Sequence, residues 1–160
     1  MRYTCTIIML LVIGALAGCG NSTTAITPDG GVVTVSEDGD TVDVKLQRGA
    51  DEQVHITANE QGVPLPAEFP KDVPVYSDAT ITASTTVPDG MNLVLSTGKP
   101  VSDVAAFYQK ELKAQGWAIE ATTNMPTGSM IAARKEKRTV TAMIAHEDET
   151  TTVSLMIVNK

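Results

Sequence analysis

Cysteine is almost absent from this chain. Of 160 residues only two are cysteines, Cys5 and Cys19, and both lie near the N-terminus. No cysteine follows Cys19, so the rest of the chain cannot form an internal disulfide. Long apolar runs are also missing, because the most apolar stretch, 7–15, is far shorter than the roughly 20 residues that a spanning helix needs.

Residues typical of catalytic and metal sites are scarce. There are two histidines, His55 and His146, and neither neighbours a serine or cysteine in a nucleophile setting. The segment 146–149, "HEDE", offers metal-ligand types, but at a hairpin end, where solvated charge is expected. The segment 37–40, "EDGD", lacks the spaced oxygen ligands and closing glutamate of an EF-hand. We therefore expect a protein without enzymatic activity, metal or cofactor.

Basic residues are outnumbered, with 12 Lys and Arg against 19 Asp and Glu and a net charge of −7. An acidic surface argues against nucleic acid as a partner. The basic turn 134–138, "RKEKR", is too short to change this. An acidic surface also gives no electrostatic reason to lie flat on anionic lipid.

The N-terminus has the order of a secretory signal peptide. Arg2 supplies the positive charge, and residues 7–15 form the apolar region. Residues 16–18, Leu-Ala-Gly, form a cleavage region of mostly small residues. The pattern Leu-Ala-Gly-Cys, 16–19, resembles the lipobox of bacterial lipoproteins. This resemblance implies that 1–18 is removed and that Cys19 carries a diacylglycerol, with palmitate among its acyl chains. Removal takes Arg2 alone among charged residues, so the acidic excess grows from 7 to 8.

The next segments predict a tether and a small sheet. Residues 19–31 are rich in Ser, Thr and Gly, which predicts a flexible tether. Residues 32–58 alternate apolar and polar side chains between turn signals, which predicts two successive hairpins. This segment has no aromatic residue, so we expect it to be marginal alone and to pack on something else.

Residues 59–76 contain four prolines, which predicts an extended connector rather than a helix or a central strand. Its apolar residues are expected to tuck against the domain surface; they are Leu65, Phe69, Val73, Val75 and Tyr76.

Residues 77–160 predict an α+β domain, an antiparallel sheet with one main helix packed on one face. Strands are expected at 79–87, 91–97, 129–135, 138–146 and 150–158. The helix is expected within 102–117, with Ser102 as its cap and Gly116 at its end.

Two-residue turns at 136–137 and 148–149 fix the register of the last three strands. One face then collects apolar residues that should take the helix: Ile131, Ala133, Val140, Ala142, Ile144, Val153, Leu155 and Ile157. The opposite face is mostly polar but carries Met130, Met143 and Met156. These three could pack under the N-terminal hairpins or the connector, form an adaptable partner surface, or offer thioethers to Cu(I).

The segment "PAEFPKDVPVY", 66–76, and the helix "FYQKELKAQGW", 107–117, resemble a group of small bacterial lipoproteins of unknown function. The likeness covers about 66–160 and carries no functional residue with it. It favours a lipid-anchored protein of the bacterial cell envelope. Gly20 follows Cys19 at the position where aspartate resembles an inner-membrane retention signal, so we expect the outer membrane facing the periplasm, or the outside of a single membrane. We expect a binding or assembly module with an envelope protein as partner; the alternative is a tethered inhibitor that presents a loop such as 136–137.

Overall fold

The protein is described here by a computed structural model that covers residues 22–49 and 52–159. This part of the chain contains ten strands and one helix. In chain order these are β1 (Ser22–Ile26), β2 (Val32–Asp38), β3 (Thr41–Arg48), β4 (Glu52–Ala58), β5 (Thr80–Val87), β6 (Gly90–Thr97), α1 (Val101–Ala114), β7 (Ala118–Met125), β8 (Gly128–Lys135), β9 (Arg138–Glu147) and β10 (Thr150–Asn159).

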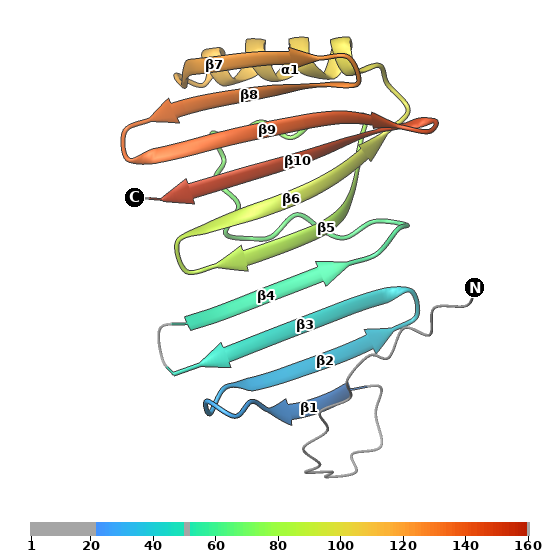
Figure 1. Ribbon diagram of the computed structural model, residues 1–160, viewed down its shortest axis with the longest axis vertical. Helices are drawn as coiled ribbons and strands as arrows, with labels where there is room; N and C mark the ends of the chain where they lie inside the picture. The colour runs from blue at the N-terminus through green and yellow to red at the C-terminus, as the bar shows by residue number, and fades with distance from the viewer. Residues whose placement is uncertain (1–21, 50–51, 160) are drawn as a thin grey trace, which may run out of the picture.

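All ten strands belong to one antiparallel sheet, in the order β1-β2-β3-β4-β5-β6-β10-β9-β8-β7 (Figure 1). Strands β1 and β7 are its two edges. The α+β class and the single helix are as predicted, but the sheet is larger than expected. The predicted hairpins 32–58 form β2, β3 and β4 and extend the main sheet, because β4 pairs with β5 from His55–Thr86 to Ala58–Ala83.

The register predicted for the last three strands is confirmed. Ala133 lies opposite Val140, and Lys135 opposite Arg138. Leu155 pairs with Ala142 in the next hairpin. In each two-residue loop the first residue, Glu136 or Asp148, has a positive φ, near 55° and 52°. Short loops and a one-sided apolar pattern therefore determine this part of the sheet.

The helix ends as predicted but begins differently. Gly116 has a φ of 81°, and the Trp117 amide donates to the Leu112 carbonyl at 2.9 Å, which closes the last turn. At the other end the cap position is Pro100, and Ser102 lies inside the helix with its hydroxyl directed to Asp103. The Ser102 cap was therefore wrong.

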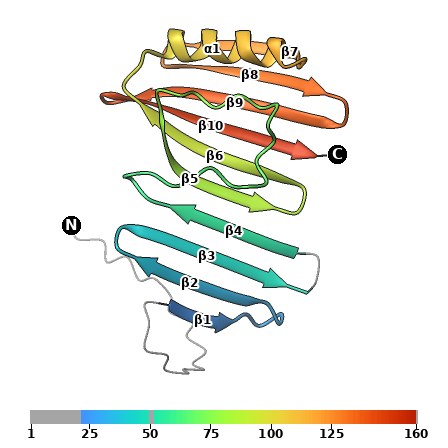
Figure 2. The same cartoon turned by 180° about the vertical axis from the view of Figure 1, so that it is seen from behind.

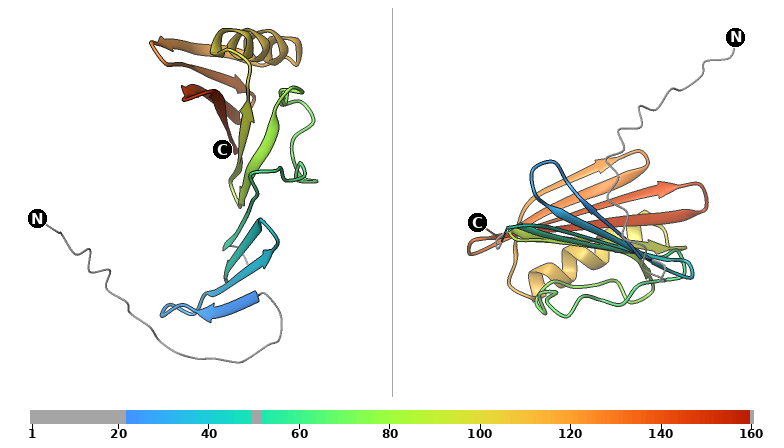
Figure 3. Two further views of the ribbon diagram at one scale, coloured as in Figure 1. Left: turned by 90° about the vertical axis from the view of Figure 1, so that its right-hand side faces the viewer. Right: turned by 90° about the horizontal axis from the view of Figure 1, so that it is seen from below.

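One face of the sheet, the inner face, is covered by α1 and by the connector 59–79 (Figures 2 and 3). Tyr108 and Leu112 of the helix and Leu93 and Leu155 of the sheet are fully buried there. The eight residues predicted to form the apolar face are all buried in this core. The connector has no regular structure and adds Phe69 and Val73 to it.

Two details of the N-terminal part differ from expectation. Within the predicted tether 19–31, Ser22–Ile26 form edge strand β1, which pairs with β2 from Ser22–Ser36 to Ile26–Val32. Thr and Ile favour extended backbone, and β2 offered a free edge for pairing. In the connector, Leu65 remains 46% exposed instead of being tucked in.

The apolar side of the sheet changes along its width. Strand pairing places Thr57 with Ser84 and Leu93 on the inner face, whereas Ile56 and Val44 lie on the opposite, outer face. In β2–β4 it is therefore the outer face that is apolar, and no helix lies on it in the described residues (Figure 3). Val42 and Ile56 remain 40% and 36% exposed.

Candidate binding surfaces

The three methionines predicted as a partner surface come together on the outer face of β8–β10. Met130 pairs directly with Met143, and Met156 pairs with Thr141, one diagonal step away. Met143 and Met156 are 52% and 50% exposed, whereas Met130 is half-buried. We call Met130, Met143 and Met156 the methionine strip.

The N-terminal hairpins do not cover the methionine strip, so the predicted alternative of packing beneath them was wrong. They join the sheet edge to edge through β4 and β5, with β6 and then β10 following. Edge pairing satisfies the backbone N–H and C=O groups of both strands, which stacking on the outer face would leave unpaired. The connector lies on the inner face. The strip is thus open among the described residues.

The immediate neighbours of the strip are uncharged, and the Arg134–Glu120 ion pair lies on the same face one alternate position beyond Ala132. From β6 to β8 the register places Asn92, Val94, Ser154, Met156, Thr141, Met143, Ala132 and Met130 on the central outer face. This is unusual on a chain with 19 acidic residues. Depletion of charge and enrichment of methionine distinguish the centre of protein interfaces from other surfaces. Flexible thioethers also adapt to partners of different shape.

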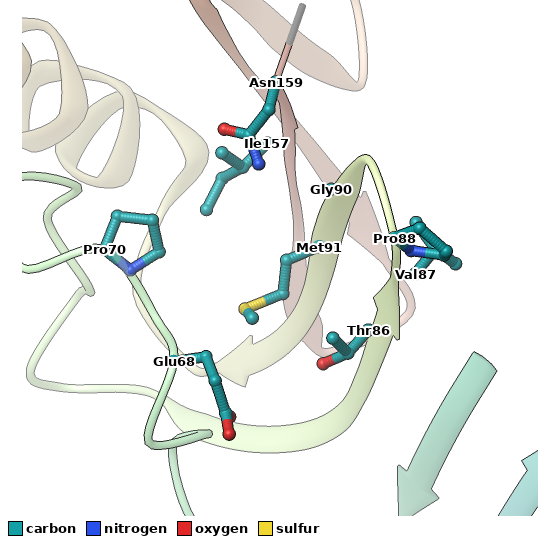
Figure 4. Close-up of a pocket in the computed structure, with 9 residues that line it drawn as sticks. All are labelled: Glu68, Pro70, Thr86, Val87, Pro88, Gly90, Met91, Ile157 and Asn159. Carbon is teal, nitrogen blue, oxygen red and sulfur yellow. The ribbon is translucent and has the colours of Figure 1, made fainter. Parts of the chain in front are cut away.

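A groove on the inner face was not found by sequence reasoning. Two pockets of about 210 and 300 Å³ lie between the connector and the sheet and share Glu68 and Thr86. The larger is lined by β4 and β5, and the smaller by β5, β6 and the end of β10. Figure 4 shows the smaller, with Pro70 on one wall and Met91 directed into the space. No apolar period or motif marks this groove, because it forms where the proline-rich connector lies across the inner face of the sheet.

The larger pocket has an apolar wall and a polar floor. Pro64, Leu65 and Pro66 face Ser84 and Thr57 across it. Ser84 is only 8% exposed, but its hydroxyl is not among the buried groups that lack a hydrogen-bond partner, so it remains accessible to solvent. An accessible hydroxyl on the floor of a pocket can donate to or accept from a bound molecule.

His55 stands at the rim of this pocket in a small polar cluster. Its Nε2 lies 2.6 Å from Oδ2 of Asp43, and the Thr57 hydroxyl donates to the same oxygen at 2.9 Å. Burial raises the pKa of Asp43, but the bonds from His55 and Thr57 outweigh it, so the pKa lies below its usual range. His146, the other histidine, lies 3.4 Å from the Thr151 hydroxyl. No group of three or more possible ligands is placed to hold a metal ion within 22–49 and 52–159.

An ionic cluster fastens the connector over the inner face. Asp72 accepts hydrogen bonds from Lys135 and Arg138, and both cations lie over the ring of Trp117. The indole Nε1 of Trp117 donates to the Asp72 carbonyl at 2.7 Å. The hydrogen bonds from Arg138 and Lys135 hold the pKa of Asp72 far below its usual range, against the opposing effect of burial. The connector is therefore fastened to the inner face at Asp72, just after the residues that line the groove.

Cys19 and the rest of 1–21 lie outside the described residues. Among the described residues, no helix has the length and apolar character required to cross a membrane.

Comparison with known proteins gives one match. A family model described as START domain-like matches residues 77–151, from just before β5 to the start of β10. No curated protein and no solved structure matches the chain. The matched part contains α1, β7–β9 and the first two strands after the connector, so the chain is similar to this family over less than half of its length.

Proposed function

We propose that the protein is a lipid-anchored, non-enzymatic binding module of the bacterial cell envelope, and that it docks an envelope protein on the methionine strip. The observation that carries the proposal is the half-exposure of Met143 and Met156 within an uncharged patch of the outer sheet face. The proposed localisation in the cell envelope rests on the lipobox-like residues 16–19. Binding rather than catalysis agrees with the START domain-like match, since such domains are generally binding modules.

The partner's chemistry follows from that face. A complementary surface would present apolar side chains to the thioethers and hydroxyl or amide groups to Thr141 and Ser154. Such an interface is held by burial of apolar area and by a few central anchors rather than by charge. Partner binding should therefore depend weakly on salt.

A photo-crosslinking amino acid at Met143 or Met156, in the native envelope, tests this surface. We expect both positions to give the same discrete adduct, and Ala106, exposed on α1 across the sheet, to give none. Met130→Glu should abolish the adduct without changing the thermal unfolding of the protein. Ala106→Glu adds the same charge on the other layer and should leave it intact. Adducts that persist in Met130→Glu would contradict the docking surface.

Anchoring is tested separately with Cys19→Ala. We expect wild type to take up labelled palmitate and to pellet with membranes, and the variant to do neither, because no helix among the described residues is long and apolar enough to span the bilayer. A variant that stays in the membrane pellet at high salt would contradict the lipid anchor, and the proposed docking surface would not be affected.

The groove favours a second candidate function, the binding of a small molecule. Its support is the pocket in which Pro64 and Pro66 of the connector and the Ser84 hydroxyl of the sheet form opposite parts of the lining. Native mass spectrometry of protein released gently from membranes would show a non-covalent mass that Ser84→Val and Glu68→Ala each reduce. The inhibitor alternative gains no such support, because Lys135 and Arg138 tie the 136–137 turn back to Asp72.

A further inference from the structure

The two edges of the sheet are protected differently. Edge strand β7 has a bulge between Ile119 and Ala121, and the intervening Glu120 pairs with Arg134 at 2.6 Å. Bulges and charges of this kind prevent an exposed edge from pairing with another chain. The β7 edge is therefore protected by its own sequence.

Edge strand β1 has none of these devices. Its sequence, Ser22 to Ile26, contains no charge and no proline, its pairing with β2 has no bulge, and all five residues are exposed. Ile26 is 76% exposed and lies opposite Val32, which is 41% exposed. Nearby, Asp29 is neutralised by an ion pair with Arg48. An uncharged and partly apolar edge in an acidic protein requires some other cover.

The position of Cys19 indicates that the lipid surface covers the β1 edge. Three residue steps separate Cys19 from Ser22, and an extended chain spans at most about 3.6 Å per residue. Whatever the conformation of these residues, Ser22 lies within about 11 Å of the cysteine. If Cys19 carries the lipid, the start of β1 is held in or next to the headgroup layer.

We propose that the β1 edge rests on the lipid surface and that the sheet rises from it, with β7 and α1 at the far end (Figure 1). The proposal rests on the lipid anchor of the proposed function. Strands in a sheet lie about 4.8 Å apart, so the nine steps from β1 to β7 span about 43 Å. Strands β2–β4 then act as a spacer between the membrane and the helix-covered part of the sheet. A spacer of this kind is held by backbone pairing and needs no hydrophobic core of its own.

This orientation places the binding surface clear of the membrane. Strands β10 and β8 are six and eight steps from β1, which corresponds to about 29 and 38 Å. The methionine strip would stand at that height, open to the side. The membrane also shields β1 from a second copy of the chain, which is the other natural occupant of an unprotected edge.

Single-cysteine labelling of the lipidated full chain tests the orientation cleanly, because Cys19 is blocked by lipid and no later cysteine exists. An environment-sensitive fluorophore is attached at Thr24→Cys on β1 or at Ala106→Cys on α1. Both proteins are reconstituted in phosphatidylethanolamine–phosphatidylglycerol vesicles that contain a headgroup-level nitroxide lipid. We expect several-fold stronger quenching at position 24 than at position 106.

A spacer variant is the matched control. Ten Gly and Ser residues inserted after Gly20 should lift β1, since a flexible linker of that total length spans roughly 20 Å. The variant should still float with vesicles but lose most of the quenching at position 24.

Each contrary result has a distinct meaning. Equal quenching at positions 24 and 106 would show a protein lying flat and would overturn the upright sheet. Floating protein with an unquenched position 24, or with disulfides between two Thr24→Cys chains, would overturn the lipid contact while leaving the anchor intact. Wild type that does not float would overturn the anchor of the proposed function, and the orientation with it.

Discussion

Arg138, the first residue of β9, donates two parallel hydrogen bonds to the carboxylate of Asp72 in the connector. Nη1 lies 2.9 Å from Oδ1, and Nη2 lies 2.6 Å from Oδ2. Lys135 adds a third contact at 2.7 Å to the same carboxylate. All three side chains are about a quarter exposed. Planar, two-point Arg–carboxylate pairs of this kind are stronger than ordinary surface ion pairs.

Asp72→Asn should lower the free energy of unfolding by about 1–3 kcal/mol, because two cations are then left side by side over Trp117. The matched control is Glu120→Gln, which removes the partner of Arg134 at a site where both side chains are nearly half exposed. That change should cost about 0–1 kcal/mol. Urea denaturation of the unlipidated Cys19→Ala chain measures both. Equal losses would show that the Asp72 cluster does no more than a surface pair.

The same carboxylate predicts a pH dependence. Its pKa in the folded protein lies well below the ordinary value of 3.8, so the unfolded chain takes up a proton at this site first. The stabilisation is complete above about pH 5 and is lost progressively as pH falls below about 4. Wild type should therefore lose stability on acidification more steeply than Asp72→Asn. Parallel curves down to pH 2.5 would contradict the shift.

Local signals explain what the sequence could predict. The apolar alternation of β8–β10 and their two-residue loops determine register, face and helix contact, because each of these depends on residues close in sequence. Gly116 likewise marks the end of α1 by its own conformation. The methionine strip followed from the same register, since Met130 opposite Met143 is a consequence of the 136–137 turn.

Long-range backbone pairing explains what it could not. The contact between β4 and β5 joins strands separated by the whole connector and uses main-chain groups, which leave no side-chain signature. The Asp72 cluster is also long-range but uses side chains, whereas β1 forms a local hairpin with β2 whose Ser- and Thr-rich sequence predicted a tether. Asp72 and Arg138 are 66 residues apart, and a charged turn such as 134–138 looks solvated until the connector crosses it.

The assignment of the inner and outer faces predicts that substitutions on the two sides of β10 lower the free energy of unfolding by unequal amounts. Leu155 is fully buried against the helix layer, so Leu155→Ala should cost about 2–5 kcal/mol. Thr152 lies on the outer face of the same strand and is half-buried, so Thr152→Ala should cost far less. Thermal and urea unfolding compare them directly. A larger loss for the threonine would mean that the outer face is the packed one.

Tyr108 predicts a stabilising substitution. Its side chain is fully buried, and no described residue completes a hydrogen bond to its hydroxyl. Burial raises the pKa of Tyr108 to about 12. An unsatisfied buried hydroxyl is unfavourable, so Tyr108→Phe should raise stability by up to about 1 kcal/mol. It should also remove the part of alkaline destabilisation that tyrosine ionisation causes above about pH 10. A clear loss of stability in Tyr108→Phe would reveal a partner for the hydroxyl.

Gly90 and Gly128 predict where the sheet tolerates no side chain. Each opens a strand, β6 or β8, and faces the backbone of its neighbour. A Cβ at Gly90 would collide with the Ile157 carbonyl oxygen, and one at Gly128 with that of Ile144. Because both obstacles are backbone atoms inside a paired strand, they cannot rotate away. Gly90→Ala and Gly128→Ala should each cost about 1–3 kcal/mol of stability, the usual range for overpacking.

Gly98→Ala is the matched control, since nothing lies within 4 Å of its added Cβ and its φ is not positive. That variant should be neutral or more stable by about 0.4–1 kcal/mol through the unfolded chain. If hydrogen exchange showed β6–β10 pairing unweakened in Gly90→Ala, these two strands would lie farther apart than described.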